Sequence, residues 1–500
     1  MRSTRIFPFA LLLAACGPRV SRVAVVASDP NTPPALSAIT EDDLRRDLFA
    51  LAGDSMRGRE AGSLDELRAS AWLGERLREA GLRPAGDDGT YFQFWPMRRV
   101  RTAAASRIAL DDGALALGAD VVVVAPVQAR VSADLVFVGE GREADVASVD
   151  LRGKAVAAVI SPPSNPPPAG VSLREFRYAR AAIVQRVAFL AGRGAAAVVL
   201  VSDSVAESAW GYAGSGMLRG RYNVDSSGTD QPAAGPPVLW VRRALLDRVR
   251  TARRLDADVI AESFVYPSVN VVAVVPGTDP ALRGQYVLYG AHQDHDGVRH
   301  AVGGDSIWNG ADDNATVAVS VLAIGRALAR RPARRSSLFV WHGAEERGLL
   351  GSRWYVAHPT VPRDSIVAVL NGDMIGRNHP DSAALLGAQP PHRNSSALVQ
   401  MALDANARLT RFAIDSSWDR PAHPEGWYFR SDHLPYARAG IPALFFTTLL
   451  HPDYHTPRDE PQRIDVAKLA RMTRWMYATG WTAGNANERP RVDAGTKLER

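Results

Sequence analysis

Apolar side chains occur along this chain in two spacings, which predict different elements. In the C-terminal half, five nearly continuous apolar runs of strand length alternate with segments whose apolar residues recur every three or four positions. The runs are VNVVAVVP, YVLYGAH, SLFVWHG, IVAVLNGD and IPALFFTT, and the clearest helical segment is NATVAVSVLAIGRALARR. Buried strands alternating with helices predict an α/β fold: a mixed, largely parallel sheet with helices on both faces.

Two helices are predicted before this sheet. The first follows Thr40, a favourable N-cap, and the second runs through SLDELRASAWLGERLREAGL and stops at Gly81. The middle of the chain has short apolar runs between Gly, Pro and polar loops, which predicts an inserted β-rich domain. The expected divisions are residues 39–120 and 265–485 for the main domain, 121–264 for the insert and 486–500 for a C-terminal tail.

The N-terminus, MRSTRIFPFALLLAACGPR, has two arginines before a short apolar run, as secretory signals do. Its LAAC sequence resembles a bacterial lipobox, and Cys16 is the only cysteine in the chain. We expect residues 1–16 to be a lipoprotein signal peptide and 17–38 a tether. The protein would then be exported and held at the bacterial cell envelope through Cys16 alone; a plain signal peptide with an incidental cysteine is the alternative.

The formal net charge of +6 raises the question of a nucleic-acid partner. The arginines are scattered among acids, however, and no nucleic-acid motif accompanies them. We therefore expect no nucleic-acid partner.

Metal-competent side chains follow these strands at their carboxyl ends. Any one of them is weak evidence of function, but the topology of a parallel sheet brings such ends to one edge. The residues are His292 and Asp294 after YVLYGA, Asp312 and Asp313 in WNGADDNAT, Glu345 and Glu346 after FVWHGA, Asp373 after VAVLNG, and His455 in HPDYHTP.

This set has the chemistry of a two-zinc hydrolase site. Zinc binds imidazole nitrogen and carboxylate oxygen, and two zincs about 3.5–4 Å apart can activate one water between them. Adjacent residues in an extended turn point different ways, so one glutamate of the Glu345–Glu346 pair can bind metal while the other takes a proton from the water. Asp294 could accept the outer N–H of His292.

The ordered motifs GAHQDH, NGADDNAT, GAEERGLLGS, NGDMIGR, SDHLPYARAGIPA and DYHTPRDEP resemble those of the M28 family of co-catalytic zinc peptidases, over residues 266–485. The resemblance implies a zinc-aminopeptidase-like fold with an inserted protease-associated domain. Carried onto this chain, the family pattern implies two zinc ions with His292 and Asp373 on one, Glu346 and His455 on the other, and Asp312 as the bridge.

The same resemblance implies the catalytic roles. Glu345 would be the general base, Asp294 would orient His292, and Asp313 would follow the bridge across a peptide that is often cis. Tyr454 would hydrogen-bond the developing oxyanion, unless it is an ordinary packed aromatic residue. Neighbouring histidines, among them His295, are expected to be outer or surface groups.

The function implied is aminopeptidase action on peptides, by attack of a zinc-bridged hydroxide. A carboxypeptidase is an alternative, with Arg377 or Arg430 gripping the substrate carboxylate. Two others are a glutaminyl cyclase and a non-catalytic binding protein on the same fold.

Overall fold

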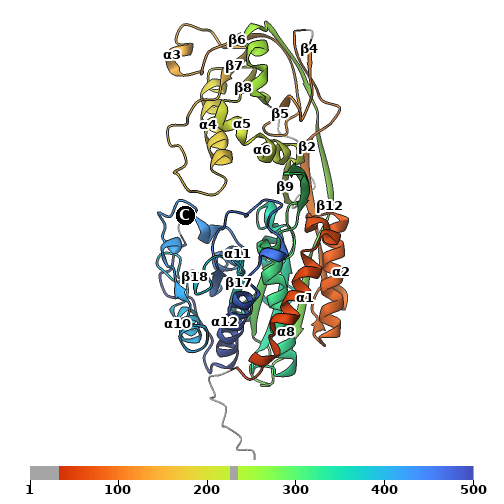
Figure 1. Ribbon diagram of the computed structural model, residues 1–500, viewed down its shortest axis with the longest axis vertical. Coiled ribbons are helices and arrows are strands. Elements are labelled where there is room, and N and C mark those ends of the chain that lie inside the picture. The colour runs from red at the N-terminus through yellow and green to blue at the C-terminus, as the bar shows by residue number, and fades with distance from the viewer. Residues whose placement is uncertain (1–32, 112, 226–234, 499–500) are drawn as a thin grey trace, which may run out of the picture.

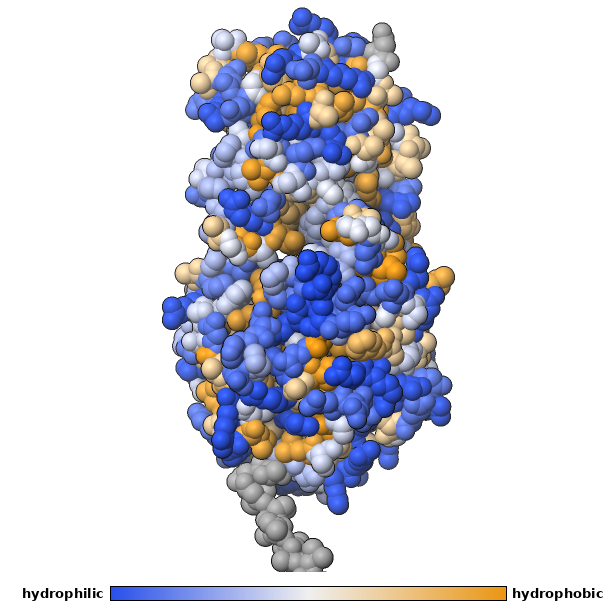
Figure 2. Space-filling view, in the orientation of Figure 1, coloured by the Kyte–Doolittle hydropathy of each residue, from blue (hydrophilic) through white to orange (hydrophobic). Residues whose placement is uncertain are grey.

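The chain forms two lobes stacked along the long axis of the molecule (Figure 1). This computed structural model describes residues 33–111, 113–225 and 235–498, so the predicted signal peptide and Cys16 lie outside the described residues. Among the described residues, no helix combines the length and apolar character that a membrane span requires. Hydrophilic residues dominate the face shown in Figure 2, with apolar residues scattered over both lobes.

The main lobe is built on a ten-stranded mixed sheet. Its four central strands β13, β16, β17 and β20 run parallel to their neighbours in this group, whereas β12 is antiparallel to β16. The α/β fold class is therefore confirmed. The strand order is β19 (Ala413–Ile414), β18 (Ser382–Leu386), β20 (Ala443–Thr447), β17 (Ile366–Gly372), β13 (Tyr286–His292), β16 (Ser336–His342), β12 (Ala261–Val275), β2 (Phe92–Thr102) and β9 (Arg221–Val224), with β1 (Arg83–Pro84) also on β12.

Helices cover both faces of this sheet because alternate residues of each strand point to opposite sides. In β13, Tyr289 packs in the larger core, whereas Leu288 packs in a separate cluster on the other face. The larger core lies under α1 (Glu41–Leu51), α2 (Leu64–Glu79), α8 (Thr316–Arg330), α10 (Ser396–Ala405) and α12 (Val466–Asn485). The opposite cluster lies under α9 (Leu350–Ala357) and α11 (His433–Arg438).

The second lobe is an eight-stranded sheet inserted between β2 and β12 of the main sheet. It begins at Arg107, before the expected residue 121, because β3 pairs with β11 and completes this sheet. Its strand order is β4 (Gly113–Leu115), β3 (Arg107–Leu110), β11 (Arg254–Val259), β6 (Ala129–Phe137), β7 (Ala155–Val159), β8 (Ala197–Val201), β10 (Val238–Val241) and β5 (Val121–Val123). Its helices are α3 (Glu143–Val146), α4 (Arg174–Ala191), α5 (Ser204–Ser208), α6 (Trp210–Arg219) and α7 (Leu246–Thr251).

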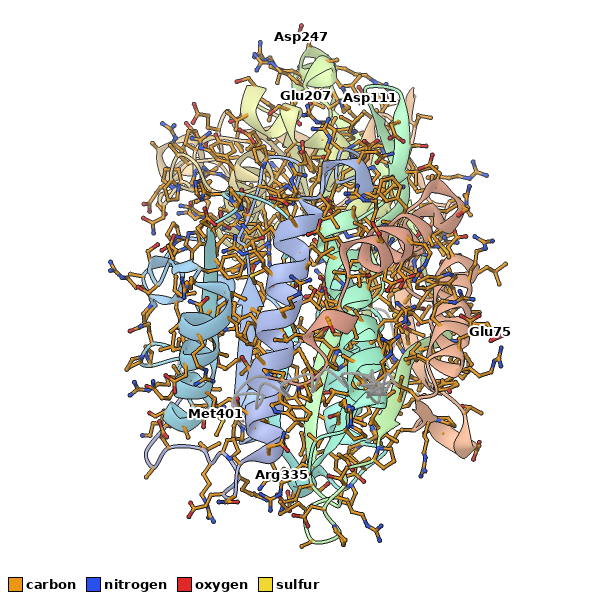
Figure 3. All side chains as sticks on the ribbon, turned by 60° about the horizontal axis from the view of Figure 1, so that its bottom comes forward. Glu75, Asp111, Glu207, Asp247, Arg335 and Met401 are labelled. Atoms are coloured by element: carbon orange, nitrogen blue, oxygen red, sulfur yellow. The ribbon has the colours of Figure 1, made fainter. Side chains whose placement is uncertain are left out.

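The central strands of the main sheet direct their carboxyl ends toward the second lobe. Arg335, directly before β16, lies at the far end of the main lobe from Asp247 of the second lobe (Figure 3). A short hairpin of β14 (Gly297–Val302) and β15 (Asp305–Trp308) follows β13, and its first strand contacts α6. The predicted metal-competent residues are thus placed where the two lobes meet.

Arg59, at the end of a short helical segment (Asp54–Arg59), connects the N-terminal helices to the loops at this edge. Its fully buried guanidinium donates four hydrogen bonds to backbone carbonyls, at 2.7–3.0 Å. The acceptors belong to Gln293, Leu51, Asn309 and Gly310. Burial lowers the pKa of Arg59 to about 10, so the side chain keeps its charge at neutral pH.

Replacing Arg59 by methionine should destabilise the folded protein. The Arg59→Met variant leaves buried carbonyls without donors, and we expect the free energy of unfolding in urea to fall by roughly 3–5 kcal/mol. Arg57→Met is the matched control, because Arg57 is exposed and, among the described residues, its one ion pair is a 3.4 Å contact with Asp65. The control should change stability by less than about 1 kcal/mol. Equal stability of the two variants would contradict the role given to Arg59.

Candidate metal centre

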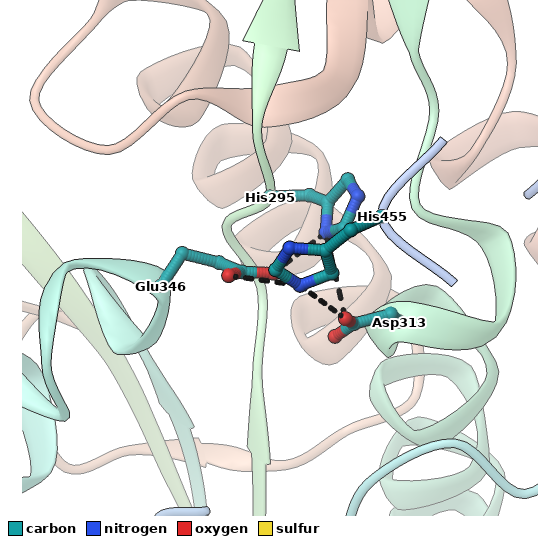
Figure 4. Close-up of side chains that lie close together, drawn as sticks. All are labelled: His295, Asp313, Glu346 and His455. Carbon is teal, nitrogen blue, oxygen red and sulfur yellow. Dashed lines mark ion pairs between the residues drawn. The ribbon is translucent and has the colours of Figure 1, made fainter. Parts of the chain in front are cut away.

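Metal-competent side chains gather in two adjacent, largely buried groups at the carboxyl ends of the central strands. Within each group, one possible ligand atom per residue lies within 4.8 Å of the others. The first group is His292, Glu345 and Asp373; the second is His295, Asp313, Glu346 and His455. Figure 4 shows the second group, whose four side chains point toward one another from separate segments of the chain.

Asp313 lies between the two groups. Its Oδ1 is 3.2 Å from His292 Nε2, and its Oδ2 is 3.1 Å from His455 Nε2. One carboxylate oxygen therefore faces each group, which is the arrangement needed for a carboxylate that bridges two cations.

Asp312, which the family pattern suggested as the bridge, faces away from both groups. Its Oδ1 accepts hydrogen bonds from the amide of Gly376 at 2.7 Å and from the hydroxyl of Thr316 at 3.1 Å. Its Oδ2 lies 3.4 Å from His451 Nε2. The position between the two groups is thus occupied by Asp313 and not by Asp312, and the cis peptide joins Asp313 to Asn314 rather than to Asp312.

The backbone of this turn is held by one further acid. The carboxylate of Asp459 accepts hydrogen bonds from the amides of Asp312 and Asp313, each at 3.0 Å. With the turn fixed in this way, the two consecutive aspartates must point in different directions.

Glu345 and Glu346 separate as the sequence suggested. Glu345 Oε2 lies 3.9 Å from His292 Nε2, in the first group, whereas Glu346 Oε2 lies 3.3 Å from His455 Nε2, in the second. Asp294 fixes the turn that carries them, because its carboxylate accepts hydrogen bonds from the amides of Glu345 at 3.0 Å and Glu346 at 3.3 Å.

The expected contact of Asp294 with His292 is made by a different atom. His292 Nδ1 is 3.0 Å from the backbone carbonyl of Asp294 and 3.8 Å from its carboxylate. The carbonyl accepts a hydrogen bond from the Nδ1–H group, and Nε2 faces the site. The Asp294 carboxylate instead accepts the hydrogen bonds of the Glu345 and Glu346 amides and makes no hydrogen bond to the His292 imidazole.

His455 receives its outer partner from the second lobe. The hydroxyl of Tyr212, on α6, lies 3.0 Å from His455 Nδ1, and His455 Nε2 faces Asp313 and Glu346. An imidazole that binds metal through one nitrogen commonly donates the other N–H to such a partner, which fixes its tautomer and ring orientation. This contribution could not be found from sequence, since Tyr212 is remote in the chain and belongs to no motif.

The charges in the two groups fit bound divalent cations. Asp313, Glu345, Glu346 and Asp373 bring four carboxylates into a space from which water is largely excluded, and uncompensated burial of like charge is costly. The polar atoms of the groups also have few partners outside the groups: His292 Nε2 faces Asp313 Oδ1, Glu346 Oε1 faces His295 Nδ1, and the buried Asp373 Oδ1 has no hydrogen-bond partner among the described residues. Imidazole nitrogen with carboxylate oxygen is a donor set that zinc prefers.

The pKa shifts have the same origin. Burial raises the pKa of Glu345 well above its ordinary value and that of Asp373 to about 6. Burial opposes protonation of His292, but the charges of Glu345 and Asp373 outweigh it and raise the His292 pKa well above its usual range. The groups therefore attract protons where a cation would otherwise supply the positive charge.

Tyr454 lies beside the site and is not a metal-competent residue of either group. Its ring centroid is 4.0 Å from that of His455, and its hydroxyl accepts a hydrogen bond of 2.8 Å from Arg430. Burial raises the Tyr454 pKa well above its usual value. The phenol stays protonated and keeps its own hydrogen to donate.

His295 was expected to be an outer or surface group, but it is fully buried within the second group. Its Nδ1 lies 2.8 Å from Glu346 Oε1. The only sequence signal was its position three residues after His292, at the same strand end.

A cavity of about 820 Å³ opens from the second group toward the second lobe. Glu346 and His455 line its floor, and residues of α4 and α6 such as Phe176 and Tyr212 line the other side. The lobes also meet at Glu425, whose carboxylate accepts hydrogen bonds from the amide of Ser172 at 2.6 Å and from Arg177 at 2.5 Å. A ligand reaching the site through this cavity would contact both lobes.

Residues 270–480 match the sequence model of peptidase family M28. A probable leucine aminopeptidase of Trichophyton verrucosum is 26% identical over 241 residues, which cover 46% of this chain and 61% of that protein. The aminopeptidase YwaD of Bacillus subtilis is 28% identical over 190 residues, 37% of this chain and 40% of that protein. This chain thus spans about three fifths of the length of the leucine aminopeptidases it matches.

Solved structures share the whole two-lobed fold. A zinc aminopeptidase from Bacillus subtilis aligns with a TM-score of 0.58 at 17% identity, covering 92% of this chain and 99% of the other. An aminopeptidase from an Aneurinibacillus strain aligns with a TM-score of 0.56 at 19% identity, covering 91% and 96%. At these identities the likeness establishes the fold.

The positions of Asp312 and Asp313 predict losses of zinc affinity of different size when each is replaced. Asp313→Asn should lower the zinc affinity by more than about 100-fold, because it alters a carboxylate shared by both groups. Asp312→Asn should lower the zinc affinity by only about 10–100-fold, the usual effect of losing a contact outside the ligand set. Competition with a chromophoric chelator measures both affinities. A larger loss in Asp312→Asn would return the bridge to Asp312.

Tyr212, which belongs to the second lobe, should raise the zinc affinity of the metal centre. Tyr212→Phe removes the partner of His455 Nδ1, and we expect zinc affinity to fall roughly 10–100-fold with the fold unchanged. The control is Tyr222→Phe, which lines the same cavity and makes no hydrogen bond to either group among the described residues. The same chelator competition applies; equal affinity in Tyr212→Phe and wild type would remove Tyr212 from this role.

Proposed function

We propose that this chain, whose residues 270–480 match peptidase family M28, is a two-zinc exopeptidase of the aminopeptidase type that acts on peptides. The observation that carries the proposal is the pair of buried ligand groups with one carboxylate between them. The names of its relatives, which include leucine and zinc aminopeptidases, support the same activity.

In this proposal His292 and Asp373 would hold one zinc, Glu346 and His455 would hold the other, and Asp313 would offer one carboxylate oxygen to each. When bound, the two ions supply Lewis acidity for the scissile carbonyl and for the attacking water. The protein contributes the fixed orientation of the ligands, through the Asp294 carbonyl on His292 and the Tyr212 hydroxyl on His455.

Glu345 acts as the general base. It stands beside the ligands yet belongs to a different group from Glu346, so its carboxylate can accept the proton of the attacking water and deliver it to the leaving amine. The hydrogen bond from its amide to Asp294 fixes the backbone that aims it.

Tyr454 stabilises the negative charge that develops on the carbonyl oxygen. Arg430 donates to its hydroxyl and also to Glu425, at 3.0 Å, so the phenol is held in place. The phenolic hydrogen is then available to the oxyanion.

The direction of cleavage favours the amino end. The carboxypeptidase alternative needs a cation to grip the substrate carboxylate, and both arginines considered for it are already engaged. Arg377 donates to Asp453 at 2.7 Å, and Arg430 donates to Glu425 and Tyr454. A glutaminyl cyclase needs one zinc only, which leaves the second ligand group without a purpose.

Two further parts of the proposal come from the sequence. We propose that LAAC, residues 13–16, is a lipobox and that the protein works at the bacterial cell envelope, anchored through Cys16. We also propose that the second lobe is a protease-associated domain that shapes the substrate cavity, which its contact with His455 supports.

Replacing Glu345 tests the mechanism. Glu345→Gln should keep near-normal zinc content while kcat on free aminoacyl anilides falls by roughly 10²–10⁴-fold, because the proton acceptor is lost. Glu346→Gln, its neighbour, should lose zinc instead. Substantial activity in Glu345→Gln would exclude it as the base.

The same anilides test the direction of cleavage. Zinc-dependent cleavage should be confined to substrates with a free amino group and be absent from N-blocked ones. Cleavage of N-blocked peptides from a free carboxyl end would instead establish the carboxypeptidase.

A further inference from the structure

We propose that His295 is a fourth protein ligand of the zinc held by Glu346 and His455, so that the two zinc positions of this chain are unequal. The inference rests on the proposed two-zinc function and goes beyond its five ligands. With His295 as a ligand, the zinc beside His455 would have four protein ligands, and the zinc beside His292 would keep a free coordination position.

The first support is the placement of the ring. His295 Nδ1 lies 2.8 Å from Glu346 Oε1 and 4.0 Å from Asp313 Oδ2, and its ring stands perpendicular to that of His455 with the centroids 5.4 Å apart. Figure 4 shows the imidazole pointing into the space that the other three side chains enclose.

The second support is that the ring has no polar partner outside its own group. The side chain is fully buried, and among the described residues Nε2 has no hydrogen-bond partner while Nδ1 faces only Glu346 and Asp313. An imidazole nitrogen buried against two carboxylates has lost its hydration, and a positive charge between them offsets that loss. A cation bound at Nδ1 supplies that charge.

The third support is that the surrounding chain is shaped to this ring. Gly310 has a positive φ of 59°, and a Cβ at that position would collide with the His295 imidazole. The His295 amide donates to the carbonyl of Arg59 at 3.3 Å, and the Arg59 guanidinium in turn holds the carbonyl of Gly310 at 2.8 Å. Arg59 thus positions the backbone of His295 through its own carbonyl and the neighbouring loop at Gly310 through its guanidinium.

The consequence follows from ligand number. His295, Asp313, Glu346 and His455 give four donors, the number that zinc takes in closed structural sites, whereas His292, Asp373 and Asp313 give three and leave a position for substrate, as in catalytic sites. We therefore infer that the ion beside His295 is retained more tightly and that the ion beside His292 carries the exchangeable position.

The experiment measures zinc in the complete chain lacking the His295 nitrogens. His295→Phe keeps a ring of similar size against His455, and His295→Ala is the second variant in case the larger ring is not accommodated. His300→Phe is the matched control, because His300 lies in the following hairpin, packs its ring 5.1 Å from that of Trp308 and belongs to neither ligand group. Bound zinc is measured after dialysis against a graded chelator series, and the visible spectrum of the cobalt(II)-substituted protein reports coordination number.

We expect wild type and His300→Phe to hold about two zinc ions per chain, released in two steps. In both His295 variants the more tightly held zinc ion should bind more weakly, by more than the roughly 10–100-fold loss expected when only a contact outside the ligand set is removed. Both variants should also show a changed cobalt spectrum. Two ions at wild-type affinity and an unchanged spectrum in His295→Phe or His295→Ala would overturn the inference alone. Fewer than two ions in wild type would instead overturn the proposed function.

Discussion

The compensation of buried negative charge is the constraint on which this structure depends. Four carboxylates share one space at the ends of the central strands, and among the described residues the side chains that form ion pairs with them are histidines and not arginines or lysines. Imidazoles divide that space into two groups, each suited to one cation. The pairing of Glu345 with Glu346, unfavourable in isolation, becomes reasonable because the two side chains serve different groups.

The protein holds these side chains through their backbone. Asp294 binds the amides of the glutamate turn, Asp459 binds those of the aspartate turn, and Arg59 binds the carbonyls of the loops between them. None of these three is in a ligand group. Each instead satisfies backbone groups that the irregular loops at strand ends leave unpaired, and in doing so it sets the direction of the neighbouring side chain.

The strands and the strand-end location of the site could be predicted because both follow from local apolar runs and from parallel topology. The choice between Asp312 and Asp313 could not, since adjacent acids in one turn are distinguished only by backbone dihedrals that Asp459 fixes from far along the chain. His295 carried no periodic signal, and Tyr212 reaches His455 only through the docking of the two lobes. The sequence therefore predicted which residue types form the site and where it lies, but not which of the adjacent residues face it.

The dependence of the aspartate turn on Asp459 also orders events during biosynthesis. Arg59, which holds the loop carbonyls, is synthesised early. The second lobe follows, and it has hydrophobic cores of its own. The turn bearing Asp313 gains its final support only when Asp459 emerges, after His455. A chain that ends before Asp459 therefore lacks the acceptor for this turn, and the centre can be completed only when nearly the whole chain is available to fold.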